Sequence, residues 1–160
     1  MATDFFLQVD GIEGESNDKN HGKWIELSSF EFGSAQNIEQ NRGTDVAGRG
    51  QFKPFSFIHP VDKATPKLQH FCMSGQKISK VKLESCRAIL GVQTPVCEVT
   101  LENAKVAKAQ VMMQEVNGTM QLVEKIEMIC AKMTWKVTPI KSDNTKGGAI
   151  EASFDQVSNS

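Results

Sequence analysis

The residues of this sequence that could do chemistry are few and widely spaced. The three histidines, His21, His59 and His70, lie far apart, and only His21 has carboxylates near it in the chain. Asp18 and His21 could together ligate a metal ion, but metal sites usually show more ligands at fixed spacing. A solvated acidic turn explains the same residues, and we favour that interpretation. The sequence therefore predicts no metal and no other cofactor.

Motifs of the common enzyme families do not occur in the chain. It has no GxSxG nucleophile elbow, no phosphate-binding P-loop, no HExxH and no GxGxxG. We therefore expect no catalytic residues and a protein that is not an enzyme.

Cysteine spacing gives no chemical signal either. The four cysteines, Cys72, Cys86, Cys97 and Cys130, form no CxxC pair and no metal-ligand pattern. Buried, reduced thiols are the simplest interpretation. One alternative stays open, because a hairpin turning at Gly91-Val92 would place Cys86 opposite Cys97.

Size and charge narrow the possible classes of protein. With 160 residues, 39% hydrophobic residues and 23% charged residues, the chain has the composition of one soluble domain over residues 1–160. A net charge of −1 gives no general attraction to nucleic acid or anionic membrane. The modest basic run from Lys77 to Arg87 alternates like a solvated strand face. No apolar run approaches the ~20 residues of a membrane span, and Met1 to Phe6 shows no Sec-type signal.

Strand patterns begin near the first residues. Phe5 to Val9 alternates with period two, and a wholly polar loop from Gly14 to Gly22 follows. Within Lys23 to Phe32, Ile25 and Leu27 share one face while Phe30 and Phe32 share the other. This change of phase predicts a bulge at Ser28-Ser29, or a strand crossing between sheets, with Gly33 ending the strand.

One helix is predicted, over about Thr65–Ser74. Thr65 suits the N-cap, Pro66 the first helical position and Gly75 the C-terminal cap. Leu68, Phe71 and Cys72 have the spacing of a single buried face.

The remaining elements are strands. A strand containing Pro54 precedes the helix, and from Lys77 onward the pattern is all strand. Asn117-Gly118 is a strong hairpin signal, and the last strand is expected around Ile150 to Val157. The fold class is therefore mainly β: a small closed β-barrel or two-sheet structure with one short helix. Glu39 to Gly50 is almost without apolar residues and should form a long exposed loop.

Two blocks of sequence carry a resemblance. Gly14-Glu15-Ser16, Asp18, His21 and Trp24-Ile25-Glu26 precede an aromatic pair and Gly33, and Val61-Asp62-Lys63-Ala64-Thr65-Pro66-Lys67-Leu68 follows with Gly75 behind it. Together, in this order, they resemble the haemolysin-coregulated protein (Hcp) family, the tube subunits of bacterial type VI secretion systems. The similarity extends over nearly the whole chain.

The resemblance implies a function that composition alone does not. Hcp-like proteins form hexameric rings that stack into a tube, and the lumen holds and stabilises small effector proteins. The implied partners are further copies of the chain, effectors, and the sheath, baseplate and spike of the machine, with no nucleic acid and no membrane insertion. The implied localisation is the bacterial cytoplasm, followed by export without a cleavable signal.

Site residues follow from the same resemblance. By position, Ser29 and Glu31 fall on the family's lumen-lining strand, although a solvated strand glutamate is an equally ordinary explanation of Glu31. The family's extended loop reaches a neighbouring subunit or ring, and the corresponding charged residues here are Glu39, Arg42, Asp45 and Arg49. Two other classes remain open. A monomeric or dimeric ligand-binding β-barrel requires an internal cavity, and a hydrolase requires a clustered acid, base and nucleophile.

Overall fold

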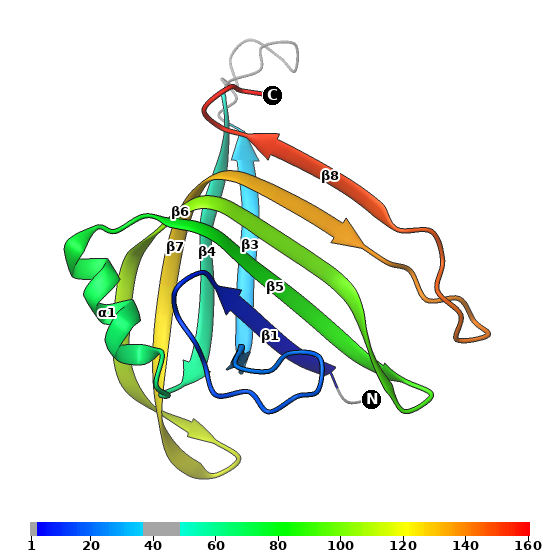
Figure 1. Cartoon of the computed structure of the whole chain (residues 1–160), viewed down its shortest axis with the longest axis horizontal. Helices are drawn as coiled ribbons and strands as arrows, with labels where there is room; N and C mark the ends of the chain where they lie inside the picture. Colours follow the sequence, from blue (N-terminus) through cyan, green and yellow to red (C-terminus); the bar gives the residue numbers. More distant parts are fainter. Residues whose placement is uncertain (1–2, 37–48) are drawn as a thin grey trace.

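The computed structural model describes residues 3–36 and 49–160, which are dominated by β-structure (Figure 1). Its elements, in chain order, are β1 (Thr3–Val9), β2 (Ile25–Leu27), β3 (Ser29–Gln36), β4 (Gly50–Pro60), α1 (Thr65–Ser74), β5 (Ile78–Ile89), β6 (Val92–Val116), β7 (Thr119–Val137) and β8 (Ile150–Asp155). The mainly β class with one short helix is thus confirmed. No helix in these described ranges has the length and apolar character of a membrane span.

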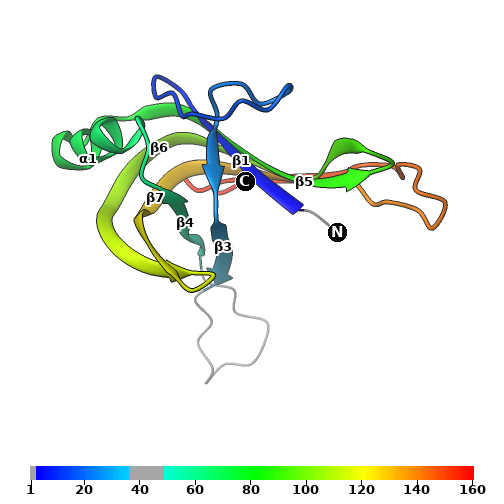
Figure 2. The same ribbon diagram turned by 90° about the horizontal axis from the view of Figure 1, so that it is seen from below.

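All the strands belong to one antiparallel sheet of eight strands. The order is β2-β1-β5-β6-β7-β4-β3, and β8 pairs with another part of β7. β6 and β7, of 25 and 19 residues, run through the whole sheet, which curls along them (Figure 2). Leu7, Ile25, Phe57 and Met133 lie in the core cluster that the curled sheet surrounds.

The curled sheet does not close into the expected barrel within the part of the chain that is described. β2 and β3 are the two ends of its hydrogen-bonded order. They follow each other directly, with only Ser28 between them, so no turn exists that could lay them side by side. Between the two strands, the Ser28 N–H donates to the Ile58 carbonyl on β4 at 2.8 Å.

The change of phase near Ser28 is present, but it is a crossing within one sheet and not between two sheets. β2 pairs with β1 and β3 pairs with β4, so the chain passes from one end of the sheet to the other. The prediction that Gly33 ends the strand is wrong. β3 continues to Gln36, because a β-bulge between Glu31 and Gly33 adjusts the register without ending the pairing.

The helix has the predicted bounds but a different N-terminus. Leu68 is buried, and Gly75 ends the helix in the left-handed region at φ 66°, its N–H bonding to the Phe71 carbonyl. The N-cap is Ala64 and not Thr65. The Thr65 hydroxyl does not cap the helix but accepts the Asp62 N–H at 3.3 Å, while the Asp62 carboxylate accepts the Ala64 N–H at 2.8 Å.

Two hairpins test the turn predictions. Asn117 and Gly118 have φ 52° and 80° and join β6 to β7, as predicted. The other turn comes one residue earlier than the Gly91-Val92 turn considered above, because Ile89 pairs with Val92.

This register changes the expected partner of Cys86. Cys86 lies opposite Pro95, while Cys97 lies opposite Ser85 beyond a β-bulge. Both thiols are free, so the pairing of Cys86 with Cys97 is not formed. The last strand, β8, ends at Asp155 and does not continue to Val157. The Val157 N–H donates to the Asp155 carboxylate instead of pairing with another strand.

Candidate functional site

The outward face of β3 carries the two residues expected at a lumen. Ser29 and Glu31 are exposed, whereas Phe30 and Phe32 pack against the core. The Phe30 ring contacts Phe5 edge to face, with ring centroids 5.1 Å apart. The alternation predicted for Glu31 is therefore present, and its side chain is available to a molecule outside the subunit.

Of the four loop residues singled out above, three (Glu39, Arg42 and Asp45) lie outside the described residues. Arg49 precedes β4, and its guanidinium donates to the Gln156 carbonyl at 2.9 Å. The Gln156 side chain also accepts the Phe52 N–H at 3.0 Å and donates to the Cys130 carbonyl at 2.9 Å. Arg49 therefore helps to join the start of β4 to the segment after β8.

The β6–β7 hairpin presents an apolar face to solvent. Its cross-strand register puts Met113 opposite Leu122 and Glu115 opposite Met120, and the alternation puts Val111 on the same face. The exposed fractions of Val111, Met113, Met120 and Leu122 are 43, 54, 57 and 48%. These four residues form what we call the hairpin patch. The hairpin runs past α1 in Figure 1, and an exposed apolar cluster of this kind is typical of a protein interface.

Several ion pairs lie on the outer face of β5, β6 and β7. The Lys82 amine lies 3.5 Å from both Glu84 and Glu98, and the other Glu98 oxygen lies 3.6 Å from Lys136. Lys132 pairs with Glu102 in the same way at 3.6 Å. Lys82, in the middle of the basic run, thus lies on a partly exposed strand face beside Glu84, as predicted.

His21 lies in a different environment from the solvated turn that the sequence suggested. Backbone hydrogen bonds from Gly14 to Lys23 and between Ser16 and Lys23 fold the polar loop onto itself. The imidazole is only 2% exposed and stacks on Phe6, with ring centroids 4.1 Å apart and planes at 4°. The solvated-turn interpretation is therefore wrong for His21, which is a buried residue that holds the loop against β1.

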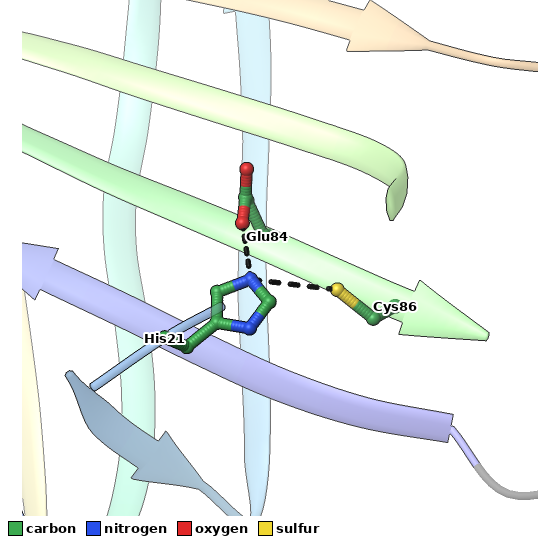
Figure 3. Close-up of side chains that lie close together, drawn as sticks. All are labelled: His21, Glu84 and Cys86. Atoms are coloured by element: carbon green, nitrogen blue, oxygen red, sulfur yellow. Dashed lines mark hydrogen bonds and ion pairs between the residues drawn. The ribbon is translucent and has the colours of Figure 1, made fainter. Parts of the chain in front are cut away.

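The polar contacts of the ring come from two elements. Its Nδ1 lies 2.6 Å from an Asp18 oxygen in the same loop, and its Nε2 contacts a Glu84 oxygen on β5. The Cys86 sulfur lies 3.8 Å from Nε2, and Figure 3 shows both β5 side chains directed at the ring. Sequence reasoning did not connect His21 with Glu84 and Cys86, because they come more than sixty residues later in the chain. Their only local signal is an i, i+2 spacing, and a β-bulge between Ser85 and Cys86 interrupts the regular alternation there.

Asp18, His21 and Cys86 have the order of groups found in thiol hydrolases, but not the required reactivity. Cys86 is fully buried, and Phe6 covers one face of the histidine ring. Burial and the surrounding carboxylates raise the pKa of the Cys86 thiol to about 12. Nucleophilic cysteines have a lowered pKa and are accessible to substrate. The arrangement is therefore unsuited to nucleophilic catalysis.

A second buried polar cluster joins β4, β7 and α1. His59 and Glu124 are fully buried, and the histidine Nε2 lies 2.8 Å from a Glu124 oxygen. The other Glu124 oxygen accepts a hydrogen bond from Gln69 at 2.6 Å, and Asp62 lies 3.7 Å from the second ring nitrogen. Burial alone lowers the pKa of His59, but the carboxylates of Asp62 and Glu124 outweigh it and raise that pKa to about 9.

An apolar groove lies between β8 and the ends of β3 and β4. Its volume is about 350 Å³, and Phe52, Trp135 and Phe154 supply its aromatic lining. It opens to solvent at the end of the sheet, unlike the enclosed internal cavity that a ligand-binding barrel would provide.

Comparison with known proteins agrees with the resemblance found in the sequence. The family model described as "Type VI secretion system effector, Hcp" matches residues 6–137. The chain is similar to protein hcp1 of Pseudomonas aeruginosa, with 29% identity over 149 residues, which cover 92% of this chain and 91% of that protein.

Solved structures give the same result. One described as a type six secretion system protein has a TM-score of 0.89 at 25% identity, over 99% of both chains. Hcp1 from Salmonella typhimurium has a TM-score of 0.81 at 26% identity, over 99% of this chain and 98% of its own. A family model that matches most of the chain, together with these full-length similarities, shows that this protein belongs to the Hcp family of type VI secretion proteins.

Proposed function

We propose that this chain is a structural tube subunit, which forms hexameric rings that stack and carry effector proteins in their lumen. Family membership is the observation that carries the proposal. The contracting sheath would supply the energy for movement, so the subunit needs assembly surfaces and no active site. The buried, high-pKa thiol beside His21 agrees with a role that is not enzymatic. The subunit would assemble in the bacterial cytoplasm and leave the cell without a cleavable signal.

Two kinds of surface would serve assembly. The hairpin patch would pack against a second copy of the chain, where burial of its four apolar side chains favours association. The charged residues Glu39, Arg42, Asp45 and Arg49 would contact a neighbouring subunit or ring. Ser29 and Glu31, on the exposed face of β3, would line the lumen and touch the cargo.

Solution mass tests the assembly directly. Size-exclusion chromatography with light scattering is expected to give six times the subunit mass of 17.6 kDa, with ring-shaped particles in negative-stain images. Met113→Glu should reduce this mass towards that of the monomer, because it places a charge in an apolar contact. The matched control, Gln114→Glu, puts the same charge on the opposite face of the hairpin and should leave the mass unchanged. A wild-type monomer at high concentration would overturn the proposal and favour a ligand-binding role for the apolar groove.

Charge reversal at Glu31 tests whether this residue lines the lumen and contacts the cargo. Glu31→Arg should weaken the binding of at least one cognate effector by about tenfold or more, because a reversed charge at a contact disturbs electrostatic complementarity. Rings should still form, since the side chain is exposed and lies outside the core. Glu102→Arg, the same reversal on the outer face of β6, is the control. Unchanged binding and stability of every cognate effector in the Glu31 variant would show that this residue does not contact cargo.

A further inference from the structure

We propose that His21, Glu84 and Cys86 form a binding site for a divalent metal ion of the zinc class. One ligand comes from the loop after β1 and two come from β5 (Figure 3). Imidazole, thiolate and carboxylate are the three ligand types that zinc takes in proteins. The site concerns the interior of the subunit and is independent of ring formation.

The geometry is close to that of a coordination shell. The three ligand atoms all lie within 4.8 Å of one another, and the histidine Nε2 and Cys86 sulfur are 3.8 Å apart. A tetrahedral zinc ion with ordinary Zn–N and Zn–S bonds separates these two atoms by roughly 3.5 Å. The Glu84 oxygen now contacts Nε2 directly, so metal binding would replace that contact by a small movement of the carboxylate.

The contacts of the His21 ring leave a place for a cation. Both ring nitrogens of His21 face carboxylate oxygens, from Asp18 on one side and Glu84 on the other. A neutral imidazole has one N–H and can donate to only one of them. A cation placed between the ring and Glu84 would satisfy the second contact. A zinc ion with one thiolate and one carboxylate balances the charge, and three protein ligands leave a fourth position for water.

Two neighbouring features suit a metal site. Asp18 holds Nδ1 at 2.6 Å, and a carboxylate in this position fixes the tautomer that presents Nε2 to a metal. A surface pocket of about 380 Å³ lies beside the cluster, because its lining includes Phe6 and Asp18, which both contact the His21 ring. Asp4, Glu15 and Glu26 also line this pocket. These acidic residues would attract a cation to the cluster from solvent.

Cobalt(II) provides a spectroscopic test on the full-length protein. Wild-type protein, treated with chelator and reloaded, is expected to bind one equivalent of Co²⁺ or Zn²⁺ and to show the thiolate-to-cobalt charge-transfer band. Cys86→Ser, which is nearly isosteric, should remove the band. Cys130→Ser is the control, because Cys130 is a buried thiol of the same sheet outside the cluster, and it should retain the band.

The carboxylates provide variants that do not alter the thiol. Asp18→Asn should weaken Zn²⁺ binding by about 10–100-fold, measured by competition with a chromophoric chelator, because it removes the carboxylate behind the ligating imidazole. Glu84→Gln should weaken it at least as much. Failure of folded wild-type protein to bind either metal, or a charge-transfer band that survives in Cys86→Ser, would overturn the proposal and identify the cluster as a structural contact between the loop and β5.

Discussion

Replacing Glu124 with alanine is expected to lower the free energy of unfolding by about 3–5 kcal/mol. The change leaves the fully buried His59 without the carboxylate that lies 2.8 Å from its ring. Removing one partner of a buried charge pair typically costs about 3–5 kcal/mol. Asp62 lies 3.7 Å from the other ring nitrogen and makes no hydrogen bond to it, so it replaces the lost contact only in part. Urea denaturation at one fixed protein concentration would measure it, because assembly contributes to apparent stability.

The same pair predicts how stability depends on pH. The pKa of His59 is raised to about 9 in the folded protein, above its ordinary value of 6.5. The protonated ring therefore stabilises the fold fully below about pH 6.5, and this contribution is lost as the pH rises through about 9. The shift corresponds to a loss on the order of 3 kcal/mol. In Glu124→Ala the slope over this window should become shallower.

Two comparisons separate this charge effect from general damage. Glu102→Ala removes a carboxylate from an exposed pair with Lys132 and should cost about 1 kcal/mol or less. The double variant His59→Leu with Glu124→Leu should cost less than Glu124→Ala alone, since replacing both members of a buried pair is often nearly neutral. If Glu124→Ala were no more harmful than Glu102→Ala, the buried pair would not have the role given to it here.

The sequence predicted those elements whose signals are local. The helix cap at Gly75, the hairpin at Asn117-Gly118 and the crossing near Ser28 each depend on a few adjacent residues, and all three are present. Local signals could not predict that the sheet stays open. Whether it closes depends on how β2 and β3 are placed after the whole sheet has curled.

The two buried histidines show why the candidate sites were harder to predict. His21 and His59 each meet a carboxylate more than sixty residues away, on β5 and β7. No spacing in the sequence marks such a pair, since the sheet register alone brings the partners together. The exposed position of Glu31, by contrast, follows from period-two alternation and was predicted.

Gly14→Ala is expected to lower the free energy of unfolding by about 3 kcal/mol. A Cβ at this position would meet the Trp24 carbonyl oxygen and would lie 2.7 Å from the Ile25 Cα, so backbone would have to move. The Gly14 N–H also bonds to the Lys23 carbonyl at 2.8 Å, which ties this residue to the start of β2. Overpacking against backbone typically costs about 1–3 kcal/mol, and in the variant the Gly14–Lys23 hydrogen bond would be strained as well. Denaturant titration with circular dichroism would measure the loss.

Gly22→Ala is the matched control within the same loop. Its nearest neighbour to an added Cβ is the Asp18 carbonyl at 3.9 Å, so the change should alter stability by no more than about 0.5 kcal/mol. The Gly14 variant should also expose Cys86, since the loop that holds His21 beside this thiol would be displaced. Faster reaction of Cys86 with a thiol reagent in Gly14→Ala than in Gly22→Ala would locate the damage at the loop. Equal stability and equal thiol reactivity in both variants would mean that the loop is not held against β2 as the backbone contacts imply, and the close approach at Gly14 would then have no energetic consequence.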